Sequence, residues 1–187
     1  YIVNNGRYKN AKRLFFKVLM KDSRGVLWIG ATSGAVFAID DKTGKRSDFI
    51  HDPADPDGLS DYQTNCLCED REGMIWIGHG SVATDRIDPG TGKIKHYQFH
   101  PGDSNSISSN IVQQIFKDRN GNLWFATWGG GLCRYHDSTD SFTSYTEKNG
   151  LVDNSMNSIV EDNKGDLCLG TGKGIWRYSP TTQTFTT

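Results

Sequence analysis

Short runs of apolar residues alternate along the whole chain with turns rich in Gly and Asp. In one stretch the runs NIVQQIFKD, NLWFATW, GLCRYHD and SFTSYT are separated by RNG, GGG and DSTD. Runs rich in β-branched and aromatic residues between such turns predict strands. Turn signals recur about every eight to twelve residues, which is too often for pairs of helices, so the pattern predicts an all-β protein.

Some of these predicted strands are apolar at successive positions instead of alternating. They read LWIG at 27–30, MIWIG at 74–78 and NLWFA at 122–126. A strand in a sheet with one wet face alternates apolar and polar residues, whereas a continuous apolar run indicates cover on both faces. We therefore expect small sheets that are stacked against one another.

The same motif, Asp-x-x-Gly-x-x-Trp, recurs at a fixed interval, and we call it the Asp corner. It starts at Asp22, Asp70 and Asp118, each 48 residues after the last, and a fourth copy at Asp162 follows 44 residues on with Cys168 in place of Trp. A period of about 40–50 residues indicates a repeat architecture whose units stack on their neighbours. Within the motif, Asp and Gly favour a tight hairpin turn.

Repeats of four short antiparallel strands, covered on both faces by copies of themselves, predict the blades of a β-propeller. The recurring Trp is expected to fill the wedge between successive blades. We expect about four blades in this segment, either a closed ring or part of a six- to eight-bladed one. The predicted blades are residues 11–58, 59–106, 107–150 and 151–187, with 1–10 a strand of a preceding blade.

Composition limits the partners of the chain. Its 187 residues carry a net charge of −1 with mixed signs, so no basic surface for nucleic acid is expected. No apolar run approaches the roughly 18 residues of a membrane helix, so we expect no direct membrane insertion by this segment. The chain begins at Tyr1 without a signal peptide, which suggests a piece of a longer protein.

The four cysteines fall in predicted strands at positions that are not equivalent, which argues against a disulfide framework. Cys66 and Cys68 would point to opposite faces of one strand, which does not suit zinc. We expect four buried free thiols. The acidic segment 52–58 lacks the bidentate Glu of a calcium loop, so neither a metal nor a cofactor is expected.

Strand order predicts where ligands would bind. One rim would carry the repeated Asp corners, which are turn residues held apart by the ring and so cannot form an acid/base pair. The opposite rim would carry the turns between second and third strands and the variable crossovers between blades, at 51–62 and 100–110. His96 and His100 are expected to be solvated. The candidate ligand-binding residues on this rim are Trp128, His79, Lys173, Tyr62, Asp61 and Asn110.

Trp128 is the sharpest of these candidates, because Thr32 and Gly80 occupy its place in other copies. Its indole would either stack on a sugar ring or cover the edge of a blade.

The run from Asp118 to Tyr145 resembles the two-component regulator propeller repeat, and so do the lead-in segments at 58–65, 106–112 and 150–157. Residues 78–88 lack the Gly-Gly pair of that repeat, and Cys168 departs from it too. The resemblance implies a periplasmic sensor module of a hybrid two-component regulator in the inner membrane, as found in Bacteroides-type gut bacteria. It implies an oligosaccharide ligand tied to polysaccharide utilisation, and a kinase elsewhere on the chain. Further blades or a second sensor protomer would be its protein partners.

Two other classes stay open. A propeller lyase or glycoside hydrolase would need an acid and a base, such as His79 and Asp85 facing each other across the rim. A purely structural propeller would bind only other proteins. The chain shows no matched nucleophile, metal set or phosphate loop, which favours a non-catalytic binding and signalling module.

Overall fold

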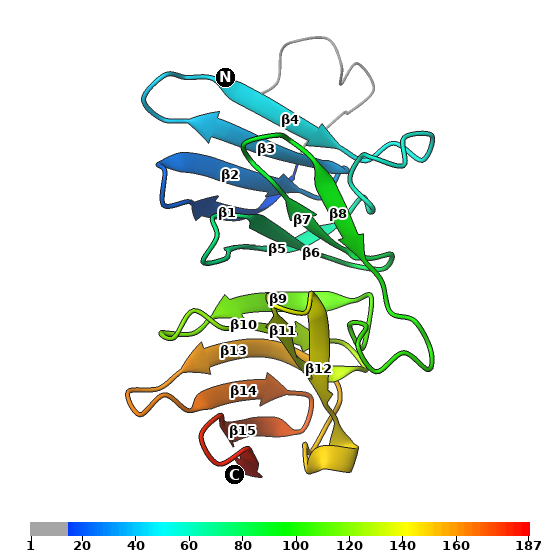
Figure 1. Cartoon of the computed structure of the whole chain (residues 1–187), viewed down its shortest axis with the longest axis vertical. Helices are drawn as coiled ribbons and strands as arrows, with labels where there is room; N and C mark the ends of the chain where they lie inside the picture. The colour runs from blue at the N-terminus through cyan, green and yellow to red at the C-terminus, as the bar shows by residue number, and fades with distance from the viewer. Residues whose placement is uncertain (1–14) are drawn as a thin grey trace.

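The structure, a computed structural model, describes residues 15–187 as four antiparallel sheets of four strands each (Figure 1). Blade I contains β1 (Phe16–Lys21), β2 (Val26–Ala31), β3 (Ala35–Asp40) and β4 (Arg46–Ile50). Blade II contains β5 (Thr64–Glu69), β6 (Ile75–His79), β7 (Thr84–Ile87) and β8 (Ile94–Tyr97). Blade III contains β9 (Val112–Lys117), β10 (Leu123–Thr127), β11 (Gly131–His136) and β12 (Ser141–Tyr145). Blade IV contains β13 (Met156–Glu161), β14 (Leu167–Thr171), β15 (Gly174–Ser179) and β16 (Thr184–Thr186).

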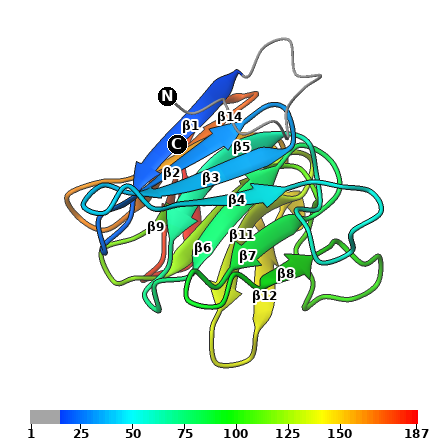
Figure 2. The same cartoon turned by 90° about the horizontal axis from the view of Figure 1, so that it is seen from above.

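In every blade the strands pair in chain order, so each sheet is a simple meander. The first strands, β1, β5, β9 and β13, contact one another from blade to blade. Seen from above, the sheets overlap with a progressive twist (Figure 2). The only helix in the described range is one 3-10 turn, Glu147–Asn149. The predicted all-β propeller with about four blades is confirmed, while the predicted strand at 1–10 lies outside the described residues.

The Asp corner does more than form a turn, as the copy in blade II shows. Asp70 accepts hydrogen bonds on Oδ1 from the backbone of Glu72 and Met74, both at 2.9 Å, while Gly73 adopts a φ of 79°. Its second oxygen accepts the indole N–H of Trp76 at 2.9 Å. Asp22 and Asp118 bind their own Trp in the same way, at 3.0 and 2.9 Å. The carboxylate therefore fixes both the hairpin and the buried indole.

The repeated tryptophans fill the space between blades, as the sequence predicts. Trp28, Trp76 and Trp124 are at most 1% exposed. Trp76 stacks on Tyr97 of its own blade at 4.8 Å between ring centroids, and its edge meets Phe125 of blade III at 5.3 Å. Burial of such large aromatic surfaces is the main apolar contribution at each interface.

Each crossover between blades is anchored by one apolar side chain. Leu59, Ile107 and Leu151 recur 48 and 44 residues apart and are at most 3% exposed. Each packs in the cluster that contains the Trp of the preceding blade. The residues that follow each anchor are thereby held at the rim opposite the Asp corners.

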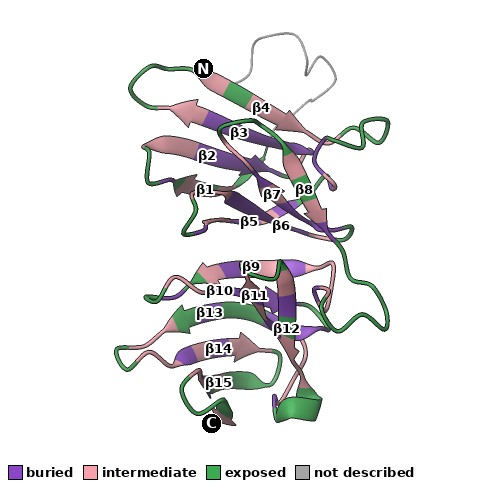
Figure 3. Cartoon of the chain, in the orientation of Figure 1, coloured by how far each residue is buried: buried purple, intermediate pink, exposed green. Residues whose placement is uncertain are grey.

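Blade IV departs from this scheme on its outer face (Figure 3). Val160 and Ile175 are 59% and 77% exposed, and Cys168, at the Trp position, is partly buried. Asp162 has no indole to bind; its carboxylate accepts the backbone N–H groups of Lys164 and Asp166 and lies 3.4 Å from the Arg177 guanidinium.

All four cysteines are free thiols. The prediction of buried thiols is correct for Cys66 and Cys133, but Cys68 and Cys168 are only partly buried. Strand alternation predicts the face of the sheet to which each cysteine points, but it does not predict how far the neighbouring blade covers that face.

Candidate functional site

The crossovers are tied to the turns beside them, and Asp61 shows how. One of its carboxylate oxygens accepts the N–H and the hydroxyl of Ser81, both at 2.8 Å, and the other accepts the N–H of Gln63. Burial opposes ionisation of Asp61, but the hydrogen bonds from Gln63 and Ser81 outweigh it and lower its pKa. With 6% of its surface exposed, Asp61 fixes the rim and has little surface to offer a ligand.

Trp128 lies in the turn between β10 and β11 and is 49% exposed. Its backbone is held on both sides: its N–H donates to the carbonyl of Ile111, and its carbonyl accepts from Ser109 Oγ, each at 2.9 Å. A fixed backbone with an open indole provides a rigid aromatic surface. The three repeated tryptophans, in contrast, are buried and offer no surface to a ligand.

Asn110 and Phe99 extend this surface along the crossover between blades II and III. Asn110 Oδ1 accepts the N–H of Phe99 at 2.7 Å, and the Phe99 ring is 41% exposed. Phe99 also borders a hollow of about 630 Å³ between the crossover and β12. Its hydroxyl and amide lining comes from Ser104, Asn105, Ser106, Ser108, Thr143, Ser144 and Thr146. We call Phe99, Asn110, Trp128 and this hollow the crossover site.

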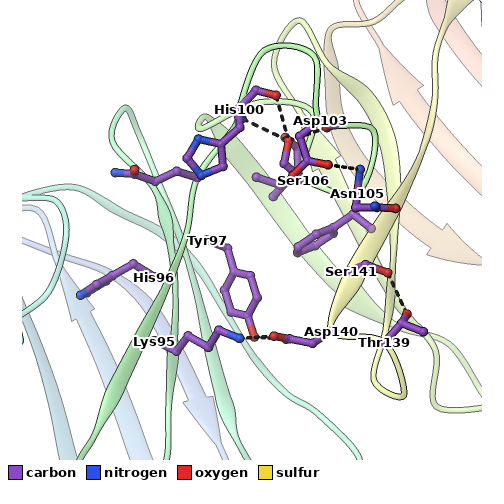
Figure 4. Close-up of a pocket in the computed structure, with 13 residues that line it drawn as sticks. Lys95, His96, Tyr97, His100, Asp103, Asn105, Ser106, Thr139, Asp140 and Ser141 are labelled. Carbon is purple, nitrogen blue, oxygen red and sulfur yellow. Dashed lines mark hydrogen bonds and ion pairs between the residues drawn. The ribbon is translucent and has the colours of Figure 1, made fainter.

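A second hollow, of about 500 Å³, lies beside the same crossover, between β8 and β12 (Figure 4). Asp140 accepts hydrogen bonds from the hydroxyls of Tyr97 and Tyr135, both at 2.7 Å, and pairs with Lys95. Burial, and then the hydrogen bonds, raise the pKa of Tyr97, while burial raises that of Tyr135 to about 12. Because these groups are engaged with one another, they join blades II and III at the outer edge.

The other exposed candidates lie on other blades. Tyr62, in the crossover between blades I and II, is 53% exposed and has its ring edge on His51 at 4.1 Å between centroids. Lys173, in blade IV, donates to the carbonyl of Val152 at 3.1 Å and lies 3.5 Å from Glu147. The structure brings Asn110 and Trp128 onto one rim segment, and it distributes Tyr62 and Lys173 around that rim.

His79 and Asp85 face each other, but in the core of blade II. Both side chains are fully buried, and His79 Nε2 lies 2.9 Å from Asp85 Oδ2. His96 also contacts this carboxylate, through Nδ1 at 2.7 Å, so the expectation that His96 is solvated is wrong. Burial disfavours the Asp85 anion, yet hydrogen bonds from His79 and His96 outweigh burial and hold its pKa well below the usual range.

Residues 15–187 contain neither a metal-binding cluster nor a membrane-spanning helix. No group of three or more His, Cys, Asp or Glu side chains there is arranged to hold a metal ion. In the acidic segment, Asp52 and Asp55 cap their own loop by accepting the N–H groups of Ala54 and Asp57. Within the same range, no helix is long and apolar enough to cross a membrane.

Comparison with known proteins supports the class of the repeats. Residues 58–81 and 106–129 match the two-component regulator propeller family. Each matched segment runs from a crossover through its Asp corner to the turn beyond the buried Trp. The resemblance predicted from the sequence is confirmed, and the chain carries repeats of this type. No curated protein matches the chain.

Solved structures agree. The chain is similar to the extracellular domain assigned to the hybrid two-component system BT4673 of B. thetaiotaomicron, at 27% identity and a TM-score of 0.74 over 91% of this chain and 24% of that one. The extracellular domain of system BT3049 from the same organism has the same fold, at 20% identity and a TM-score of 0.73 over 91% of this chain and 23% of that one. This chain therefore spans about a quarter of the length of these structures.

A solved enzyme structure also has a similar fold. An inactive variant of virginiamycin B lyase from Staphylococcus aureus matches at 20% identity and a TM-score of 0.66, over 94% of this chain and 55% of that one.

Proposed function

We propose that this chain is part of the extracytoplasmic, periplasmic sensor of a hybrid two-component regulator, and that it binds an oligosaccharide at the crossover site. The matched repeats and the similarity to the BT4673 extracellular domain support the sensor class. A kinase elsewhere on the full-length protein would receive the signal, and polysaccharide utilisation would be the process under control. The module itself has no catalytic role in this proposal.

Exposure of Trp128 is the observation that carries the ligand assignment. Its side chain is 49% exposed on a rigid turn, whereas the repeated tryptophans are at most 1% exposed. Sugars present apolar C–H faces and hydroxyl edges. The open indole and the Phe99 ring match the apolar faces, and the hollow beside Phe99, lined mainly by hydroxyl and amide groups together with Asp103 and Lys148, matches the hydroxyl edges.

A route for the signal follows from the anchors. Ile107 is fully buried among the residues that join blades II and III, three positions before Asn110. If the crossover has two conformations and the ligand binds one of them more tightly, binding shifts the equilibrium toward that conformation and toward the packing of blades II and III that goes with it. Binding at the rim would thus act on the interface between two blades.

The structure gives less support to the enzyme alternative. A general acid or base must come within hydrogen-bond reach of its substrate, but His79 and Asp85 are fully buried and bound to each other. At 20% identity, the likeness to the lyase shows the fold alone.

Calorimetric titration of an oligosaccharide panel into the parent chain and Trp128→Ala tests the proposal. Loss of an aromatic anchor commonly costs about 2 kcal/mol or more, or roughly thirtyfold in affinity. Lys42→Ala is the matched control, because Lys42 is exposed in the turn between β3 and β4, on the opposite rim. Equal affinity in all three proteins would contradict the site, and release of reducing ends or unsaturated products would favour an enzyme. Binding of protein partners without any saccharide would favour the interaction propeller.

A further inference from the structure

Blade II has a cluster of ionisable groups in its core at positions where blade III has none. The repeat interval of 48 residues and the strand registers make four of its residues equivalent to four in blade III. The pairs are Ser60 and Ser108, His79 and Thr127, Asp85 and Cys133, and His96 and Ser144. In blade III these groups are neutral, with Ser108 Oγ 2.7 Å from Cys133 Sγ. In blade I, Ala31, Phe37 and Asp48 stand at the positions of His79, Asp85 and His96, and Asp48 pairs with Arg46 of its own strand, so the three-residue cluster does not form there.

Asp85 is the centre of this cluster and has no exposed surface. Oδ2 accepts the backbone N–H of Ser60 at 2.8 Å and lies 2.9 Å from His79 Nε2, while Oδ1 lies 2.7 Å from His96 Nδ1. One carboxylate thus joins β6, β8 and the crossover between blades I and II.

The second nitrogen of each ring also meets an acceptor. His79 Nδ1 lies 3.1 Å from the Gln63 carbonyl, and His96 Nε2 lies 3.1 Å from the Pro56 carbonyl. Carbonyls and ionised carboxylates only accept hydrogen bonds, and a neutral imidazole donates from only one nitrogen. With Asp85 ionised, His96 satisfies both contacts only as the doubly protonated imidazolium. His79 has the same pair of contacts but is fully buried, whereas the His96 side chain is 29% exposed, so His96 is the ring that can exchange a proton with solvent.

We propose that His96, Asp85 and His79 form a proton-binding site that latches the crossover 51–60 onto blade II, so that the module responds to pH as well as to its ligand. When His96 loses a proton, it keeps one hydrogen bond and gives up the other. The bond to the charged carboxylate is the stronger of the two. The bond that breaks is therefore the one from His96 to the Pro56 carbonyl. Pro56 lies in the crossover that leads directly to Asp61 and Tyr62 on the rim.

The groups around His96 favour its protonated form. Asp85 faces it from β7 and Asp57 from the crossover. A hollow of about 290 Å³ beside it is also lined by His51, Asp52 and Asp55. On the side toward blade III, the second hollow is lined by Lys95, which pairs with Asp140, and by His100 and Asp103. Figure 4 shows the His96 ring pointing away from that hollow.

The direction of the pH effect follows from the folded-state pKa. The hydrogen bond to Asp85 raises the pKa of His96 above its ordinary value of 6.5, and burial opposes this only in part. A raised pKa means that the latch is complete below about 6.5 and is lost as the pH rises through the folded-state value.

Amide hydrogen exchange of residues 55–60, followed from about pH 5 to 9 and corrected for intrinsic rates, tests the latch. We expect protection to fall by roughly tenfold or more as His96 titrates, which is the usual effect of one hydrogen bond to a charged group. His96→Ser installs the blade III residue and should give low, pH-independent protection. His100→Ser is the control. The His100 ring has no hydrogen bond among the described contacts, so this variant should behave like the parent. Residues 103–108, in the equivalent crossover, should show no such step in any of the proteins.

A flat profile in the parent, or a parent-like step in His96→Ser, would overturn the proposal. The second result would assign the step to a group other than His96. Titration of the His96 ring by NMR gives a check without substitution. We expect its midpoint above 6.5, and a midpoint at or below that value would contradict the latch.

Discussion

The two rims of this propeller are built by opposite rules. On one rim, three Asp corners repeat the same hydrogen bonds, from the hairpin N–H groups to the indole of the buried Trp. On the other, the crossovers share one buried anchor each, but the residues around the anchor differ from blade to blade. Repetition marks the contacts that every blade needs to stack, and variation marks the positions that packing leaves free for function.

The strongest way to break this comparison is to remove a wedge. Trp76→Ala should lower the free energy of unfolding by about 3–5 kcal/mol, because it empties the interface between blades II and III. Equilibrium denaturation in urea measures the loss. A change below about 1 kcal/mol would mean that the repeated Trp is not a packing residue.

The carboxylate of the corner can be tested against the degenerate copy. Asp70→Ala should lower the free energy of unfolding by about 1.5–3 kcal/mol, because it removes the carboxylate that binds both the buried Trp76 N–H and the Arg86 guanidinium. Asp162→Ala is the matched control, since Cys168 offers no indole there. Each carboxylate also has one arginine partner, Arg86 for Asp70 and Arg177 for Asp162, so equal losses in the two variants would show that the indole bond adds nothing to the motif.

The variable rim should give the reverse result. Trp128→Ala should change the free energy of unfolding by less than about 0.5 kcal/mol, because half of the side chain is already exposed and its backbone contacts remain. The same denaturation experiment measures it. A loss as large as that of Trp76→Ala would make Trp128 a cover for the blade edge.

The cysteines give the smallest effect and distinguish inner from outer faces. Burial raises the pKa of Cys66 to about 12 and that of Cys68 to about 11, and Cys133 is fully buried, so these three should resist alkylation in the native state. Cys168, on the outer face of blade IV, should react first. Mass spectrometry of partially labelled protein reads out the order, and faster labelling of Cys66 or Cys133 would contradict the burial pattern.

The fold could be predicted from the sequence because its signals are local and repeated. A 48-residue interval, turn residues at fixed positions and continuous apolar strands each point to stacked four-stranded units. The indole bond of the Asp corner was not predicted, although the constant spacing of Asp70 and Trp76 could have suggested it. Asp70 is already explained as a turn residue and Trp76 as a packing residue, so nothing else in the sequence calls for a bond between them.

The contacts among His79, Asp85 and His96 depend on how neighbouring strands pair, and this pairing register cannot be read from the sequence. His79, Asp85 and His96 lie on three neighbouring strands, and they meet only because Ile77 pairs with Asp85 and Asp85 with His96. A shift of one residue would turn Asp85 to the other face. Asp61 is a predicted ligand-binding residue, and the structure adds that its carboxylate caps the neighbouring turn, a contact between two loops that their spacing in the sequence does not reveal.

The central claim, that three tryptophans hold the blades and a fourth binds ligand, is tested most directly by the indole N–H signals in an NMR titration with oligosaccharide. The account predicts that Trp28, Trp76 and Trp124, bound to their carboxylates, exchange slowly with solvent and stay in place. Trp128 should exchange fast and move as the saccharide is added. Movement of the three bound indoles with no change at Trp128 would contradict it.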